Sequence, residues 1–170
     1  MMPADINDAF ARITPIPYVI ITSLDAKGKP NAMGLSWVTR VSSSPPLMLI
    51  SVGQDRYSRE GIQKIGEYVI NYPNADQAKG AWICGTQSGR TTDKIAASGF
   101  ELIPSTTVKP PTIKDAVVAF ECRVVEEREI GDHILFIGEV MAAVINPMRT
   151  KHLFYTSENV LLAMDSKGNR

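Results

Sequence analysis

The sequence predicts a mainly β protein, built as a closed or nearly closed antiparallel barrel with a few short helices at its rim. Apolar runs rich in Val and Ile recur along the chain, each bounded by Gly, Pro, Asn or Asp, which is typical of strands. The helical segments, in contrast, are few and short. Many strands with few helices favour a barrel. The 170 residues amount to one expected domain, 1–170, long enough to bury its own core.

Each expected element follows from a local pattern. The expected strands are 17–24, 30–37, 46–53, 67–72, 116–127, 133–145 and 159–164. The fifth and sixth strands are joined by REIGD and form a long hairpin. Three short helices are expected: one that begins with Ser58 as its N-cap, one over about 74–83, and TTDKIAAS, which ends at Gly99.

Composition and charge disfavour several classes of function, although they leave room for a local basic pocket. Lys and Arg number 18 and so do Asp and Glu, so the chain has no net attraction for nucleic acid or an anionic membrane. No apolar stretch approaches the roughly 20 residues that span a bilayer, and the start of the chain does not resemble a secretory signal. Cys84 and Cys122 lie far apart and form no metal-type pair. We therefore expect reduced thiols and a cytoplasmic protein.

Common catalytic motifs are absent from the sequence. It contains no HExxH, GxSxG, CxxC or GxGxxG. The segment CGTQSGRT at 84–91 approaches a phosphate-binding loop, but it has Cys84 where that loop needs Gly and Arg90 where it needs Lys. Two histidines are too few for a multi-His metal site, so no metal is expected.

The strand in GKPNAMGLSW has one face made only of small residues. Because side chains alternate along a strand, Ala32, Gly34 and Ser36 share one face and Asn31, Met33, Leu35 and Trp37 share the other. Glycine in a strand often marks the close approach of a ligand or of another backbone. The small face therefore indicates either a flat, hydrogen-bonding ligand, or a bulge or tight packing against a neighbouring strand.

Two segments have the features of phosphate sites. Arg56 and Ser58 lie where a strand meets a helix, and SGRTTDK places Arg90 and Lys94 where a second helix opens. Helix starts offer free N–H groups and a positive dipole end, and Arg pairs bidentately with phosphate. The alternative is a solvated arginine beside an ordinary N-cap.

The remaining notable side chains have simpler interpretations. His133, in GDHILF, is either a turn residue with local hydrogen bonds or a ligand-contacting or proton-transferring group at a pocket rim. His152 is interpreted as structural or exposed, and Cys84 and Cys122 as small core or rim residues and not nucleophiles. Trp37 and Trp82 are interpreted as core or interface residues.

Taken in order, these motifs resemble the flavin reductase-like proteins with an FMN-binding split β-barrel, a family that includes flavoredoxins and archaeal ferric reductases. The resemblance runs from about residue 14 to about 146. The matching segments are P-x-x-x-x-T-S at 17–23, GKPNAMGLSWVTRVSSSPP at 28–46, DRYSREGI, GTQSGRTTDKI at 85–95, and AFECRV followed by GDHILFIGEV.

The resemblance implies an antiparallel, Greek-key split barrel that binds FMN. It places the cofactor against Asn31, Ala32, Met33, Gly34, Ser36, Trp37, Ser51, Arg56, Ser58, Ser88, Arg90 and Lys94. In the family's pattern, residues like Ser51, Arg56 and Ser58 hold the phosphate and Lys94 lies near the ring. His133 matches a histidine that borders the nicotinamide or acceptor site, and no side chain is assigned with certainty to catalysis.

The resemblance also implies an activity and partners. NAD(P)H would reduce FMN, which would pass electrons to free flavin, a ferric chelate or a partner protein, with the chemistry supplied by the cofactor. A homodimer with the flavin near the subunit contact is expected. Two alternatives remain, a flavoredoxin-like carrier that does not oxidise NAD(P)H and a non-catalytic flavin-binding protein. The stretch VSSSPP lacks the cysteine of archaeal ferric reductases, which argues against that specialised role.

Overall fold

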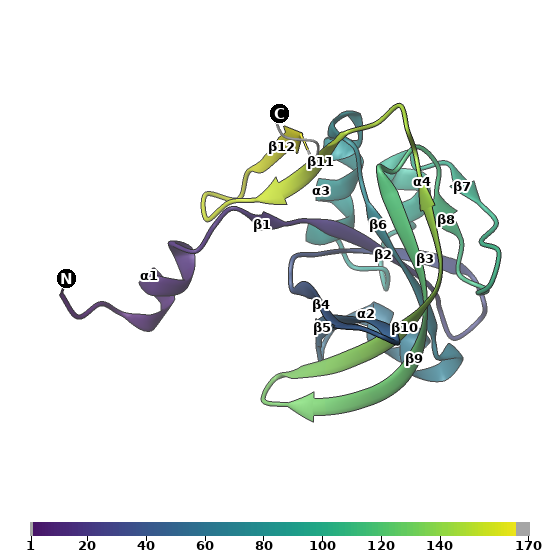
Figure 1. The fold of residues 1–170 in the computed structure, drawn as a ribbon, viewed down its shortest axis with the longest axis horizontal. Coiled ribbons are helices and arrows are strands. Elements are labelled where there is room, and N and C mark those ends of the chain that lie inside the picture. The colour runs from purple at the N-terminus through teal and green to yellow at the C-terminus, as the bar shows by residue number, and fades with distance from the viewer. Residues whose placement is uncertain (1, 166–170) are drawn as a thin grey trace.

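A curved antiparallel sheet dominates the structure, a computed structural model that describes residues 2–165. Within these residues, seven strands pair in the order β3-β2-β6-β9-β10-β5-β4 (Figure 1). The strands are β2 (Val19–Leu24), β3 (Pro30–Leu35), β4 (Val38–Ser43), β5 (Pro46–Gly53), β6 (Glu67–Tyr72), β9 (Val118–Ile130) and β10 (His133–Ile145). The predicted mainly β, antiparallel fold is confirmed.

The barrel is open at one seam. Its two edge strands, β3 and β4, are consecutive in the chain and are joined only by Ser36 and Trp37. The Trp37 carbonyl accepts a hydrogen bond from Ser51 N at 3.0 Å, which holds this link beside β5. The seam therefore exposes the chain that follows β3.

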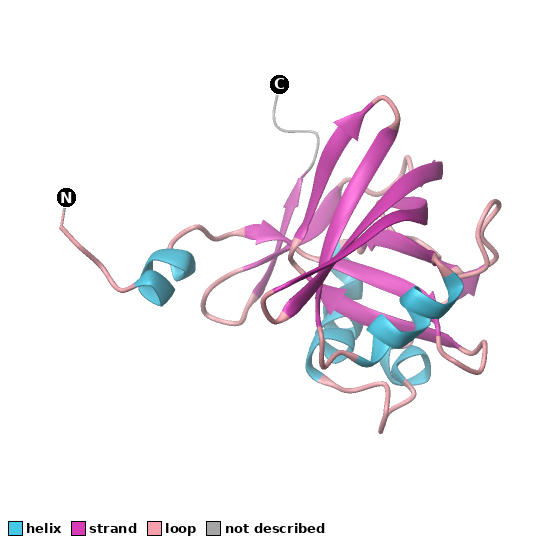
Figure 2. Ribbon diagram, turned by 90° about the horizontal axis from the view of Figure 1, so that it is seen from below, coloured by secondary structure: helices cyan, strands magenta, loops and turns pink. Residues whose placement is uncertain are grey.

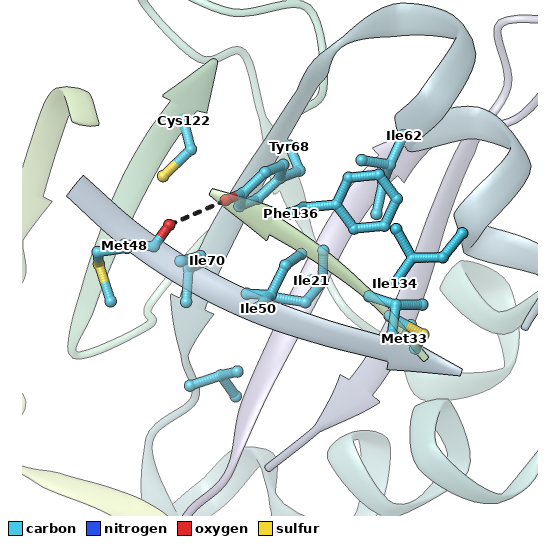
Figure 3. Packing of buried hydrophobic residues seen from close by; sticks show 12 residues of the cluster. Ile21, Met33, Met48, Ile50, Ile62, Tyr68, Ile70, Cys122, Ile134 and Phe136 are labelled. Carbon is cyan, nitrogen blue, oxygen red and sulfur yellow. Dashed lines mark hydrogen bonds between the residues drawn. The ribbon is translucent and has the colours of Figure 1, made fainter. Parts of the chain in front are cut away.

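The barrel core follows the period of two expected of strands. Successive inward positions such as Tyr68 and Ile70, or Ile134 and Phe136, are almost fully buried and pack together (Figure 3). Ile62 adds a helix residue to this cluster. Tyr68 Oη donates to the Met48 carbonyl at 3.4 Å, so the phenol has an acceptor inside the core.

Most of the short helices gather on one side of the barrel, and the N-terminal helix stands away from it (Figure 2). Two small sheets accompany the large one in the described residues. The helices are α1 (Ile6–Ala11), α2 (Tyr57–Ile65), η1 (Ala75–Gln77), α3 (Ala78–Thr86) and α4 (Lys94–Ser98). The small sheets are β1 (Ile16–Pro17) with β11 (Lys151–Tyr155) and β12 (Leu161–Asp165), and β7 (Leu102–Ile103) with β8 (Thr112–Ile113). Helices α3 and α4 pack against β3. None of the helices in residues 2–165 is long and apolar enough to cross a membrane.

The expected strands 46–53, 67–72 and 133–145 match β5, β6 and β10. The predicted strand 30–37 stops at Leu35, because the chain turns at the seam. The other predicted strands have shifted ends: 17–24 is divided into β1 and β2, 116–127 is Val118–Ile130, and 159–164 is Leu161–Asp165. The expected helix over 74–83 is η1 followed by α3, which extends to Thr86.

The predicted N-cap of α2 was wrong. Arg56 is the N-cap residue, with extended backbone, and Ser58 lies inside the helix. The predicted end of α4 at Gly99 is confirmed, since Gly99 adopts the left-handed conformation (φ 70°) that glycine tolerates. Helix α1 and strands β4 and β11 were not predicted.

Candidate functional site

A cavity of about 670 Å³ opens at the seam of the barrel. It lies between the end of β3, the start of α2, the loop after α3, and the tip of the β11–β12 hairpin. Of the residues predicted for the site, those that line it are Met33, Gly34, Ser36, Trp37, Ser51, Arg56, Ser58, Ser88, Arg90, Lys94 and His133. Its volume suits an organic cofactor.

Asn31 and Ala32 do not line this cavity. Asn31 is buried, and its Nδ2 donates to Ser58 Oγ at 2.7 Å. Ala32 packs in a separate cluster with Ala81 and Cys84 of α3. Asn31 therefore orients a cavity residue, whereas the Ala32 side chain supports the helix behind β3.

The start of α2 offers an anion site. Helix α2 has no side chain that caps its first N–H groups, although Arg56, Tyr57 and Ser58 all line the cavity. Because Ser58 Oγ accepts a hydrogen bond from Asn31, its own O–H is free to donate elsewhere. The Arg56 side chain is more than half exposed, and its ion pair with Asp55 is long at 3.5 Å. These donors and the helix dipole suit a phosphate.

Lys94 supplies a buried cation to the same cavity. Its exposed fraction is 5%, and its Nζ donates to the Cys84 carbonyl at 3.3 Å. Burial lowers the pKa of Lys94, and burial raises the pKa of the nearby Cys84 thiol to about 11, so that thiol stays neutral. Among the ion pairs of residues 2–165, none involves Lys94. An electron-rich ligand atom would compensate this charge.

Arg90, in contrast, is already engaged. Its Nη2 pairs with Glu60 Oε1 at 2.9 Å, its Nη1 donates to the Asp55 carbonyl at 2.9 Å, and its guanidinium lies 5.5 Å from the centre of the Tyr57 ring. Arg90 therefore fastens the loop after α3 to the start of α2. Its contacts with protein groups are shorter and more numerous than those of Arg56, whose ion pair with Asp55 spans 3.5 Å.

Trp37 and His133 form a flat wall at the cavity mouth. Their ring centres are 4.5 Å apart and their planes differ by 28°. His133 Nδ1 lies 2.6 Å from Asp132 Oδ1, a hydrogen bond that lowers the pKa of Asp132. This contact fixes the imidazole through one nitrogen and leaves Nε2 available to another group.

Tight packing explains the glycine on the small face of β3. A Cβ on Gly34 would lie 2.0 Å from Tyr18 Oη and 2.8 Å from Gly85 Cα. The backbones of β3 and α3 therefore approach too closely for any side chain at this position. Tight packing therefore accounts for Gly34, and its neighbours are the Tyr18 side chain, which directly precedes β2, and the backbone of α3. Because Gly34 also lines the cavity, the ligand alternative stays a prediction.

Comparisons with known proteins place the chain in a family. Residues 10–161 match the profile of the family described as "Flavin reductase like domain". The chain belongs to this family. The sequence resemblance is thereby confirmed.

The chain is similar to several named and uncharacterized proteins and to solved structures. An uncharacterized protein of Archaeoglobus fulgidus is 39% identical over 124 residues, which cover 73% of this chain and 68% of that protein. The NADH:riboflavin 5'-phosphate oxidoreductase of Streptomyces pristinaespiralis is 28% identical over 136 residues, which cover 80% of this chain and 74% of that protein. The crystal structure of a flavoredoxin from Methanosarcina acetivorans is 29% identical with a TM-score of 0.86, and the match covers 100% of this chain and 94% of that one. For a relative in Pyrococcus abyssi the match spans 64% of its length.

Several cavity residues escaped the sequence analysis. Tyr155 and Asn159, from the β11–β12 hairpin, line the cavity, and Tyr155 Oη donates to Asn159 Oδ1 at 2.6 Å. Tyr18, Trp82 and Cys84 line it as well. No motif marks Tyr18, Tyr155 or Asn159, and Trp82 and Cys84 were interpreted without a role in ligand binding. The packing of the small C-terminal sheet and of α3 beside β3 brings these residues to the seam.

Proposed function

We propose that this chain is an FMN-binding oxidoreductase that uses NAD(P)H to reduce its flavin and passes the electrons to free flavin, a ferric chelate or a partner protein. The observation that carries the proposal is one cavity with a buried, uncompensated cation, Lys94, and an uncapped helix start at Arg56. A ligand with an electron-rich aromatic ring system and a phosphate would pair its ring with Lys94 and its phosphate with the start of α2. The membership in the flavin reductase family supports the same ligand.

The residues of the cavity fit the two ends of FMN. Arg56, Ser58 and the first N–H groups of α2 would hold the phosphate, with Ser51 buried close by on β5. The ring would lie toward Trp37 and Met33, with the small residues Gly34 and Ser36 at its edge. Ser88 lines the cavity from the loop that precedes Lys94, and this loop would close that side of the cavity.

Bound FMN would supply hydride-accepting and electron-donating chemistry, so this chain needs no nucleophile. Lys94 would place its positive charge where negative charge develops on reduction, and burial strengthens that effect because little water screens it. Asp132 would hold His133 beside Trp37 at the mouth, where the imidazole borders the space for the electron donor or acceptor.

The test is an absorbance spectrum of the purified protein with FMN, before and after anaerobic addition of NADH and of NADPH. A stoichiometric flavin spectrum that bleaches with either nucleotide is the expected result. If the protein binds no flavin after incubation with FMN, the assignment of the cavity is wrong.

A flavoredoxin-like carrier is the second candidate, and the similarity to the Methanosarcina flavoredoxin favours it. Such a carrier would hold FMN tightly without oxidising NAD(P)H itself. In the same experiment its flavin would stay oxidised with both nucleotides and bleach with dithionite or reduced ferredoxin. A non-catalytic flavin-binding protein would bleach with dithionite alone.

We further propose a homodimer formed through the outer face of β4, β5 and β10. The helices pack against β2 and β3, whereas β5 and β10 carry apolar residues on both faces, as strands covered on both sides do. The outward residues are Leu47, Leu49, Leu135 and Ile137, with the exposed Val41 beside them. Ser51 and His133 lie in the same two strands, so the flavin would be near the subunit contact. Sedimentation of wild type and Ile137→Glu tests it, since the variant should dissociate.

A cytoplasmic location is also proposed. Cys84 and Cys122 are both free and buried, which is compatible with a reducing compartment.

A further inference from the structure

Asn31 is a polar side chain of β3 that is buried beside the cavity without lining it. Its exposed fraction is 7%, and its Nδ2 donates to Ser58 Oγ at 2.7 Å. Ser58 has an exposed fraction of 3% and does line the cavity, from the first turn of α2. Asn31 therefore reaches a ligand through the Ser58 hydroxyl and not by direct contact.

The strand register places the Asn31 side chain at the junction of the barrel core and α2. Asn31 is two residues from Met33, whose side chain packs in the core, so both side chains lie on the inner face of β3. Helix α2 packs against β2 and β3, and its Ile62 belongs to the same core cluster. An apolar residue in place of Asn31 would extend the core, but it could not donate to Ser58.

The backbone of the loop after α3 also lies against Asn31. A Cβ on Gly89 would be 2.6 Å from Asn31 Oδ1 and 2.5 Å from Tyr57 Cδ1, which leaves no room for a side chain at this position. The Asn31 amide is therefore confined, with its oxygen near this loop and its nitrogen on Ser58.

The hydrogen bond from Asn31 determines what the Ser58 hydroxyl can do. A serine hydroxyl has one proton to donate, and when it accepts from an amide that proton must point elsewhere. Among residues 2–165, no protein acceptor takes the Ser58 proton. Because a buried donor without an acceptor is costly, an oxygen atom of a ligand in the cavity would be favoured here.

We infer that Asn31 is a positioning residue, which directs the Ser58 hydroxyl proton into the cavity and so makes the start of α2 select the phosphate of FMN over the uncharged end of riboflavin. A hydrogen bond to an anionic oxygen is roughly twice as strong as one to a neutral oxygen. The inference rests on the proposed binding of FMN and extends it to a residue that does not touch the ligand.

A double-mutant cycle on flavin affinity tests the role of Asn31. Ser58→Ala removes the hydroxyl. Asn31→Asp replaces the amide with a group of the same shape that only accepts, so the Ser58 proton should turn toward it and away from the cavity. Fluorescence titration gives the dissociation constants of FMN and of riboflavin for wild type, the two single variants and the double variant. Urea denaturation of each flavin-free protein establishes that it folds.

The cost of Ser58→Ala should depend on the residue at position 31. In the wild-type background it should raise the dissociation constant of FMN by about tenfold or more and leave that of riboflavin nearly unchanged. In the Asn31→Asp background it should change FMN affinity by less than about threefold, because the hydroxyl no longer donates to the phosphate. The added carboxylate charge is present in both members of that pair and cancels from the comparison. A merely structural role of Asn31 would change stability or both flavin affinities without this coupling.

The possible failures are distinguishable. An equal cost of Ser58→Ala in both backgrounds would overturn the role of Asn31 and leave FMN binding standing. Unchanged FMN affinity on Ser58→Ala in the wild-type background would do the same, because the hydroxyl then does not donate to the phosphate. A wild-type protein that binds no FMN would overturn the proposed function, and the inference with it.

A second measurement needs no substitution at Asn31, in case that variant does not fold. The side-chain amide protons of Asn31 are observed by NMR in wild type and in Ser58→Ala. One of the two resonances should shift when the acceptor is removed, whereas Ser42→Ala on β4, the matched control, should leave both in place. Resonances that stay unchanged in Ser58→Ala would show that the amide does not donate to Ser58, which would overturn the inference.

Discussion

Glu121 and Lys94 are both buried charged residues, with exposed fractions of 1% and 5%, yet their surroundings are opposite. Glu121 accepts hydrogen bonds from the backbone and side chains of Thr106 and Thr107, at 2.6 to 3.2 Å. Lys94 donates to one carbonyl, that of Cys84. Burying a charge is costly unless hydrogen bonds or a partner compensate it.

The difference separates a structural charge from a functional one. Glu121 fastens the loop between β7 and β8 to β9, and its hydrogen-bonding capacity is used within the protein. Lys94 retains unused N–H donors toward a cavity, so the folded chain bears a cost that a ligand can remove. Substitution at Glu121 should therefore affect folding, and substitution at Lys94 should affect binding.

Glu121→Gln is expected to have the largest effect. The amide places an NH₂ group against donors and leaves at least one of them buried without an acceptor, which should lower the free energy of unfolding by about 2–4 kcal/mol. Urea denaturation of the flavin-free protein measures it. The matched control is Glu126→Gln on the exposed part of the same strand. A loss under 1 kcal/mol would mean that the loop is held by other contacts.

Lys94→Met should weaken FMN binding without lowering the stability of the flavin-free protein. The loss of a charged hydrogen bond costs about 1.5–3 kcal/mol, or roughly 10- to 150-fold in dissociation constant. Flavin fluorescence titration gives that constant, and urea denaturation gives the stability. The control is Lys79→Met, an exposed lysine on α3. Unchanged FMN affinity in the Lys94 variant would remove the main support for the site.

The two arginines of the cavity extend the comparison. Arg56→Ala should weaken FMN roughly tenfold and leave riboflavin unchanged, because riboflavin lacks the phosphate. Arg90→Ala should change both affinities alike, since Arg90 is bound to Glu60 and the Asp55 carbonyl. Titrating FMN and riboflavin into each variant gives, for each, the ratio of the two dissociation constants. Equal ratios for Arg56→Ala and Arg90→Ala would contradict the phosphate assignment.

The sequence predicted elements whose patterns are local. Strands β5, β6 and β10 have long apolar runs that end at turn residues, and their ends were predicted correctly. Strand β4, VTRVSS, was missed because its polar side chains hide an edge strand that depends on pairing with β5. The six-residue helix α1 has no buried face in its own chain, so no core pattern marked it.

In the candidate site, too, the sequence predicted the residues with local motifs and missed what depends on tertiary contacts. Arg56, Ser58 and Lys94 were predicted from helix-start motifs and family resemblance, and the fold brings all three to one cavity. The sequence did not distinguish Arg56, which has a long ion pair with Asp55, from the more tightly held Arg90, because Glu60 reaches Arg90 only after α2 and the loop after α3 meet. It also left open whether Gly34 serves a ligand or packing, because the atoms that a Cβ there would meet belong to Tyr18 and Gly85, which are distant in sequence.

The smallest expected effect is on the pH dependence of stability, and its sign differs for the two buried charges. Burial alone raises the pKa of Glu121, but hydrogen bonds from Thr107 and Thr106 outweigh it and hold the pKa below 4.5. Glu121 therefore stabilises the fold above its unfolded pKa and loses that contribution as the pH falls through the lower folded value. The stability difference between wild type and Glu121→Gln should shrink as the pH falls through 4.5 and below.

Lys94 has the opposite dependence. Burial lowers its pKa from 10.5, so the cost of its charge is present at neutral pH and is relieved as the pH rises above the lowered folded value. Any stability advantage of Lys94→Met over wild type should therefore narrow toward pH 10, in flavin-free protein followed by urea denaturation. FMN that pairs with the ammonium should raise that pKa again, so binding in mildly alkaline buffer should be accompanied by proton uptake. Calorimetry in buffers of different ionisation enthalpy measures the uptake, which should disappear in Lys94→Met; if it persists there, another group takes up the proton and Lys94 is not the residue that compensates the flavin.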